Sequence, residues 1–113
     1  SIIDKGENDS SLVLYFNFLN LDFLLMGDAS KVIENSILNE VSYLNVDILK
    51  VGHHGSSTST SYNFIKTIKP KEAIISCGKN NKYGHPSIEV INILSYFDVN
   101  IRRTDIEGTI VYN

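Results

Sequence analysis

Three apolar segments of this chain end in the same way, with a glycine beside polar residue types. They read FLLMGD at residues 23–28, VDILKVGHHGS at residues 46–56 and AIISCG at residues 73–78. Each is a short and nearly continuous apolar run, as expected for a strand in a sheet that is covered by helices. The pattern predicts an α/β fold that brings polar side chains to one edge of a sheet. In open sheets of this kind, ligands and catalytic groups collect at the carboxyl ends of the strands.

The remaining sequence fits alternating strands and helices within one domain over residues 1–113. The predicted strands are residues 11–18, 21–26, 46–51, 72–77, 99–103 and 109–112, with the last two pairing around residues 105–108. A first helix is capped by Ser30, and its inward face carries Ile33, Ile37, Val41 and Leu44. A second helix covers residues 62–68, and Pro70 ends it. A third begins at Pro86 or Ser87, with Ile88, Ile91, Leu94 and Phe97 inward. The predicted order is β-β-α-β-α-β-α-β-β.

The composition is that of a folded globular domain. The chain of 113 residues is 42% hydrophobic and 20% charged, which excludes a disordered class. No apolar run reaches the roughly 18 residues of a membrane span, and the first residues do not form a secretory signal. The single cysteine, Cys77, excludes an internal disulfide. Its apolar surroundings favour a buried thiol over a nucleophile.

Charge is divided unevenly along the chain. The net charge of −3 is not the signature of a nucleic-acid-binding protein. However, residues 1–49 hold two lysines and eight acidic residues, and residues 50–113 hold eight basic and five acidic residues. Within residues 50–82, Glu72 is the one acid among Lys50, Lys66, Lys69, Lys71, Lys79 and Lys82. These lysines could line a site for a phosphate backbone, or they could simply be a solvated surface.

Four side chains have the chemistry of a metal or acid–base site. Asp28 is either a metal ligand or a cap for the helix that follows it. His53 and His54 are adjacent, and neighbouring side chains of an extended chain point to opposite sides. One histidine is therefore expected to bind a metal while the other supports it or touches substrate, and the alternative is a hydrogen-bonded pair in a loop. His85 could donate a proton to a leaving group or contact phosphate, or it could lie on the surface at a helix start.

Two polar residues are weaker candidates for substrate contact. Ser56 opens the Ser/Thr-rich loop over residues 56–61, whose hydroxyls could bind a phosphate. Asn81 lies in a polar loop, where asparagine is a turn former first and a ligand contact second. Lys50, Ser56 and Asn81 are together the predicted substrate-binding residues.

Several of these motifs resemble one known family, the metallo-β-lactamase domain of ComEC-type competence proteins. The segments KVGHHGS at residues 50–56 and NKYGHP at residues 81–86 are specific for this group, whereas the dipeptide Gly27-Asp28 is not. The resemblance covers nearly the whole chain. Its other elements are residues 8–14, 46–49, 69–71, 75–80 and 103–105, with Gly108.

The resemblance implies an αββα sandwich with one or two metal ions, zinc or manganese, between its sheets. It also implies metal-dependent hydrolysis of a phosphodiester, with a DNA strand as substrate during uptake. On this template Asp28 matches the acid that bridges the metals, and His54 is favoured as a metal ligand. His53 would support the site, and His85 would face the substrate or donate a proton. The chain would then act beside a membrane channel domain of a longer protein.

The family takes most of its metal ligands from a His-x-His-x-Asp-His segment, and this chain contains no such segment. We therefore expect the chain to be the C-terminal half of a metallo-β-lactamase-like domain, inactive alone. Such a half would need the remainder of its own domain as a partner, or would form a homodimer. One alternative is a non-catalytic module for DNA binding or assembly. Another is part of a standalone phosphoesterase, cytoplasmic or secreted.

Overall fold

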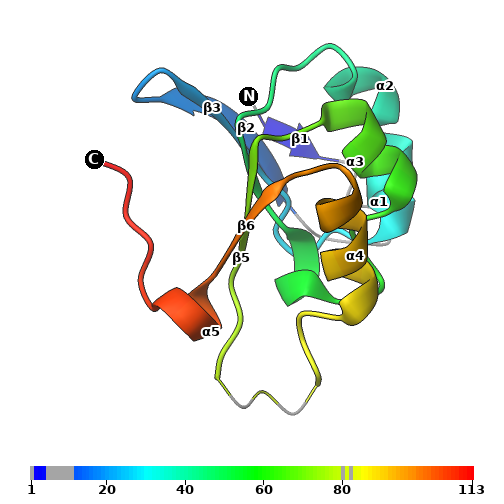
Figure 1. Cartoon of the computed structure of the whole chain (residues 1–113). Coiled ribbons are helices and arrows are strands. Elements are labelled where there is room, and N and C mark those ends of the chain that lie inside the picture. Colours follow the sequence, from blue (N-terminus) through cyan, green and yellow to red (C-terminus); the bar gives the residue numbers. More distant parts are fainter. Residues whose placement is uncertain (1, 5–11, 80, 82) are drawn as a thin grey trace.

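The computed structural model describes residues 2–4, 12–79, 81 and 83–113, and it shows a mixed α/β architecture (Figure 1). The six strands lie in sequence order across one sheet. Their bounds are β1 Ile2–Asp4, β2 Leu12–Phe18, β3 Leu21–Leu25, β4 Ile48–Lys50, β5 Glu72–Ile75 and β6 Asn100–Arg103. Strands β1, β2 and β3 pair antiparallel, and β3 to β6 pair parallel. The predicted α/β class is confirmed.

Helices cover one face of this sheet, where Figure 1 shows α1 to α4 side by side. The helices are α1 Lys31–Ser36, α2 Leu38–Val41, α3 Tyr62–Ile68, α4 Ile88–Tyr96 and α5 Thr104–Glu107, with a 3-10 turn, η1, at Gly52–Gly55. Alternate strand residues such as Leu24, Leu49 and Ala73 are fully buried in a core with Phe64 and Leu94 of the helices. Among the described residues, no helix is long and apolar enough to cross a bilayer.

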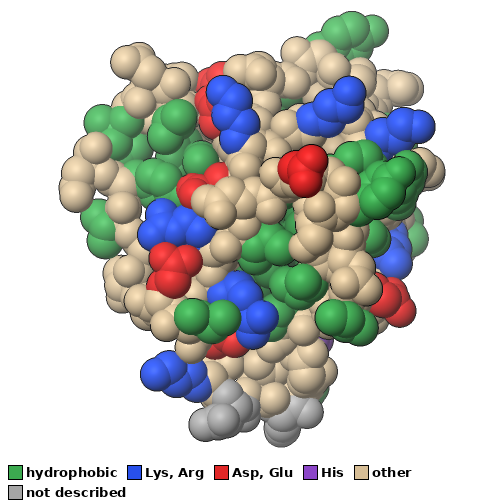
Figure 2. Space-filling view, viewed as in Figure 1, with side chains coloured by type: hydrophobic (Ala, Val, Ile, Leu, Met, Phe, Trp, Pro, Cys, Tyr) green, Lys and Arg blue, Asp and Glu red, His purple; other side chains and the backbone are tan. Residues whose placement is uncertain are grey.

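The opposite face of the sheet, here called the open face, carries α5 and the C-terminal segment (Figure 1). The strand register places Phe16 beside Phe23, and their rings stack at a centroid distance of 5.2 Å. Tyr112 lies against Phe23 at 5.3 Å and donates a hydrogen bond to Glu72. Apolar side chains of β2 remain exposed, and Phe18 is 49% accessible. Figure 2 shows hydrophobic side chains at the surface, interspersed with charged ones of both signs.

Four predictions about the elements were wrong or incomplete. Residues 109–112 form no strand, because they cross the open face instead of pairing with β6. The first helix is interrupted at Ile37, which separates α1 from α2. Helix α4 buries Val90 and Leu94, whereas Ile88 is 69% exposed. Strand β1 and helix α5 were not predicted. Ser11, the predicted start of β2, lies outside the described residues.

The parallel arrangement sets the position of the candidate site. Strands β3, β4 and β5 run in the same direction, so their carboxyl ends reach the same edge of the sheet. A backbone hydrogen bond of 3.2 Å from Met26 N–H to Lys50 O continues the pairing beyond β3. The polar segments that follow these strands therefore start next to one another, as the sequence pattern predicts.

Candidate metal and phosphodiester site

The turn after β4 holds two consecutive histidines in an unusual backbone conformation. His53 has φ 50° and His54 has φ 54°, both in the left-handed region that non-glycine residues rarely adopt. The backbone of His53 makes two of the hydrogen bonds that hold this turn: its N–H donates to Gly27 O at 2.8 Å, and its O accepts from Ser56 N–H at 2.9 Å. Strain of this kind persists only where the surrounding structure imposes it, and it concentrates at functional sites.

His54 is oriented by the backbone carbonyl of Ser76, the residue that follows β5. Its Nδ1 lies 2.8 Å from Ser76 O. Since a carbonyl oxygen only accepts, Nδ1 carries the proton and donates it, and in the neutral imidazole the lone pair is then on Nε2. Histidine ligands of metals are typically held in this tautomer by such a bond. The His54 side chain therefore fits the role of a metal ligand through Nε2.

His53 turns toward the Ser/Thr-rich loop. Its Nδ1 is hydrogen-bonded to the Thr58 hydroxyl at 3.0 Å, and this hydroxyl is also 3.0 Å from Ser56 Oγ. The two histidines thus have different partners, as expected for neighbouring side chains. Ser56, a predicted substrate contact, is 6% exposed, and its hydroxyl also accepts from Thr58 N–H. Its visible role is to order the loop, and its contact with substrate remains a prediction.

A buried carboxylate anchors the other end of this loop. Glu34 of α1 is 1% exposed. Its two oxygens accept hydrogen bonds from Thr60 N–H and, at 2.9 Å, from Ser61 N–H. Burial raises the pKa of Glu34 above its ordinary value, and the bonds from residues 60 and 61 oppose this rise. The Ser61 hydroxyl in turn caps α3 by accepting from Phe64 N–H at 3.1 Å.

A pocket of about 210 Å³ opens beside His54. Its lining residues are His54, Cys77, Gly78, Asn81, Tyr83 and His85. Three residues predicted for the site, His54, Asn81 and His85, therefore share one pocket. Part of this pocket comes from the turn after β4 and part from the loop between β5 and α4.

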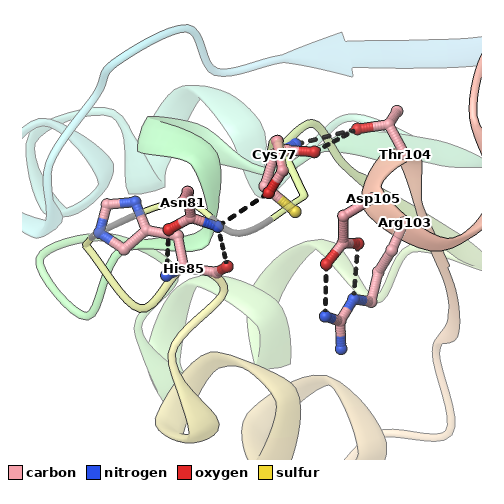
Figure 3. Close-up of polar contacts among 7 residues, drawn as sticks. Cys77, Asn81, His85, Arg103, Thr104 and Asp105 are labelled. Atoms are coloured by element: carbon pink, nitrogen blue, oxygen red, sulfur yellow. Dashed lines mark hydrogen bonds and ion pairs between the residues drawn. The ribbon is translucent and has the colours of Figure 1, made fainter.

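The Asn81 side chain holds the second of these loops together (Figure 3). Its Oδ1 accepts from His85 N–H at 2.8 Å, and its Nδ2 donates to His85 O at 2.7 Å and to Gly78 O at 3.0 Å. Both amide hydrogens are thus used inside the loop. Asn81 was predicted as a substrate contact, but these bonds make it a residue that positions His85. A direct contact with substrate remains untested.

The loop is also fastened to the turn after β4. Ser87 N–H donates to Gly55 O at 2.8 Å. A Cβ added to Gly55 would lie 2.7 Å from Pro86 Cβ, and Gly55 has φ 80°. Only glycine fits this position. The backbone that carries His85 is therefore packed directly on the backbone that carries His54.

Cys77 is a pocket residue that the sequence analysis placed in the core. It is 9% exposed, and burial raises the pKa of its thiol, with a further contribution from Asp105. The Thr104 hydroxyl accepts from Cys77 N–H at 2.9 Å and donates to Cys77 O at 3.0 Å (Figure 3). Arg103 forms two hydrogen bonds with Asp105. The two bonds with Thr104 hold the backbone of Cys77 in place at the pocket wall.

Asp28 and Lys50 lie at the same edge of the sheet. Asp28 is exposed beyond β3, and Lys50 is half-buried at the end of β4. Burial lowers the pKa of Lys50, and the nearby Asp28 carboxylate opposes that change. Asp28 follows Gly27, whose carbonyl accepts from His53 N–H. The predicted approach of Asp28 to His54 stays a prediction, although both residues follow neighbouring strands.

Within the described part of the chain, no three or more His, Cys, Asp or Glu side chains form a group that could hold a metal ion. Asp28 and His54 are thus at most part of a ligand set. Sequence reasoning also missed Thr58, Tyr83 and Glu34. Tyr83 lies inside the NKYGHP segment. Thr58 lies inside the predicted Ser/Thr-rich loop, but its bond to His53 was not foreseen. Glu34 carried no sequence signal, because its partners are the backbone groups of Thr60 and Ser61.

Comparison with known proteins relates this chain to competence proteins. No protein-family model matches the chain. It is 44% identical over 107 residues, or 95% of its length, to ComE operon protein 3 of Bacillus subtilis. It is also 32% identical over 94% of its length to competence protein ComA of Neisseria gonorrhoeae. The chain is a homologue of a segment of the ComEC-type competence proteins. The expected kinship with competence proteins is confirmed, and the metallo-β-lactamase fold stays a prediction.

The ComEC-type relatives are much longer than this chain. A further one, recombination protein 2 of Haemophilus influenzae, is 30% identical over all 113 residues. The chain spans about one seventh of these proteins, since it covers 14% of the Bacillus and Haemophilus proteins and 16% of the Neisseria protein.

Proposed function

We propose that this chain is the C-terminal half of a metallo-β-lactamase-like domain, and that the complete domain hydrolyses phosphodiesters of DNA during uptake. The observation that carries the proposal is the His54 geometry: an exposed imidazole, oriented by Ser76 O, with its Nε2 free beside a pocket. Homology to competence proteins supports DNA as the substrate class. As part of such a protein, the chain would be associated with a membrane through other segments.

In this proposal Asp28 and His54 contribute ligands for a divalent metal, zinc or manganese, and further ligands come from outside the described residues. Such a metal supplies an activated water and polarises the phosphoryl oxygens. His85, which Asn81 holds at the pocket, faces the substrate and gives a proton to the departing oxygen. Lys50 at the edge of the sheet and the exposed Lys79 on the loop after β5 provide positive charge for flanking phosphates.

The open face supports the half-domain interpretation. Leu12, Phe16 and Phe18 alternate along β2 and are 49%, 39% and 49% exposed. A second sheet packed on this face would bury them, as in other two-layer sandwiches.

The decisive experiment measures metal-dependent cleavage of single-stranded DNA by the full-length protein. We expect cleavage that requires Asp28 and His54, with metal content reduced in both alanine variants. His85→Ala should lower turnover by about 10²-fold or more, the usual contribution of a general acid, and should leave metal content intact. A full-length protein that binds DNA but cleaves none with zinc or manganese would instead be the non-catalytic module.

A further inference from the structure

We infer that Tyr83 is a stacking platform for a nucleobase of single-stranded DNA, next to the phosphodiester held in the pocket. This inference rests on the proposed function and specifies its substrate as a strand whose bases are unpaired. It assigns a specificity role to a residue outside the proposed chemistry.

The position of Tyr83 is the first support. It is 71% exposed and also lines the pocket beside His54. Its ring centroid lies 5.9 Å from that of His85, with an interplanar angle of 32°. The His85 ring is in turn 6.1 Å from that of His53. Three rings therefore lead from solvent to the strained turn after β4.

The hydrogen bonds of residues on either side of Tyr83 are the second line of evidence. The Asn81 amide closes the loop on both sides of Tyr83 through its bonds to Gly78 and His85. The bond between Ser87 and Gly55 fixes the following residues. An exposed aromatic ring between hydrogen-bonded residues such as Asn81 and His85 loses less conformational freedom when a planar ligand stacks on it.

The chemistry favours a base as that ligand. Strands bound without sequence preference combine cationic groups for the backbone with aromatic rings on which bases stack. Here the exposed Lys79 lies on the same loop as Tyr83. A stacked base requires an unpaired strand, because a duplex hides the faces of its bases.

The test compares two DNA strands of equal length and charge, one with thymine bases and one with abasic sites throughout. Binding to the full-length protein is measured by fluorescence anisotropy, without added metal. We expect Tyr83→Leu to weaken binding of the thymine strand about 10-fold, within the range for one stacked base. Binding of the abasic strand should stay unchanged, and Tyr83→Phe should bind both strands like the wild type.

Tyr43→Leu is the matched control, because Tyr43 is 90% exposed and precedes the opposite end of β4. It should change neither affinity. An equal loss for both strands, or no loss for either, would overturn the stacking role. Cleavage of the thymine strand by the wild-type protein with manganese is scored separately. Its absence would count against the proposed hydrolase and leave the stacking result standing.

Discussion

The Nδ1 of His54 lies 2.8 Å from the backbone carbonyl oxygen of Ser76, the residue that follows β5, so this carbonyl selects the nitrogen that carries the proton in the neutral imidazole. The first prediction follows from this contact. In metal-free protein, ¹⁵N NMR should find neutral His54 with its proton on Nδ1. Adding zinc should then shift the Nε2 resonance. A neutral His54 protonated at Nε2 would contradict the proposed ligand role.

Removal of that ligand is the second prediction. In the full-length protein, His54→Ala should weaken zinc binding at least as much as the roughly 10- to 100-fold that loss of a supporting partner costs. Isothermal titration calorimetry measures the effect. His85→Ala is the matched control, since its side chain is proposed to serve the substrate, and its zinc affinity should stay near the wild-type value. A loss of zinc in His85→Ala would make His85 a ligand.

Glu34 gives the third prediction, which concerns pH. Burial raises its pKa in the folded chain above the value of 4.5. The folded state therefore holds the proton more tightly, and stability falls as pH rises from about 4.5 through the raised pKa. Urea unfolding should show this fall in the wild type, whereas Glu34→Gln should lack it. Parallel pH profiles for the two proteins would show that Glu34 does not titrate differently on folding.

Asp47 gives the fourth prediction, in which stability changes with pH in the opposite direction to that for Glu34. A bond of 2.8 Å from Asp22 N–H, aided by Lys71, lowers the pKa of Asp47. Its stabilisation is present above pH 3.8 and is lost as pH falls through the lowered pKa. Asp47→Ala should cost about 1–3 kcal/mol at neutral pH, because it leaves a backbone donor unpaired. Lys71 is exposed, so Lys71→Met should cost less than about 1 kcal/mol.

The open face gives the fifth prediction. The isolated chain should self-associate through the exposed side chains of β2. Phe18→Lys should reduce this association in sedimentation velocity with little loss of stability. Ile88→Lys, at a similarly exposed apolar residue on the helical side, should leave it unchanged. Equal effects of both substitutions would show that association does not depend on the open face.

Sequence alone predicted the strands that carry the site, because apolar runs such as residues 46–51 have few alternatives to a covered strand. It also predicted helix α3 over residues 62–68 and a start of α4 close to Ser87. Ser30, the predicted cap of the first helix, holds the N-cap position of α1 but makes no side-chain capping bond. Sequence reasoning failed at residues 109–112, whose β-branched and aromatic residues fit a strand. Tyr112 instead finds its partners, Phe23 and Glu72, on the open face, and no local pattern reveals such long-range contacts.

The sequence predicted which residues belong to the site, but it did not predict which contacts they make. His54 and His85 were chosen from their motifs, and they do line one pocket. The roles of Asn81 and Thr58 depend on hydrogen bonds to backbone or to another loop, which residue identity does not encode. For Asp28, the sequence predicted the position after a strand. The distance between its carboxylate and the His54 imidazole stays a prediction.

The close contact between Gly55 and Pro86 affects how a saturation mutagenesis screen would be interpreted. A methyl group at residue 55 would collide with the proline, and one at Gly52 would lie 2.9 Å from Ala29 O. Both glycines should score as intolerant as the histidines between them, although neither has a reactive atom. In a map of intolerant residues across this turn, positions needed for packing would therefore look the same as positions needed for the chemistry of the site. Variants at residues 52 and 55 should be checked for folded protein before any loss of activity is attributed to the site.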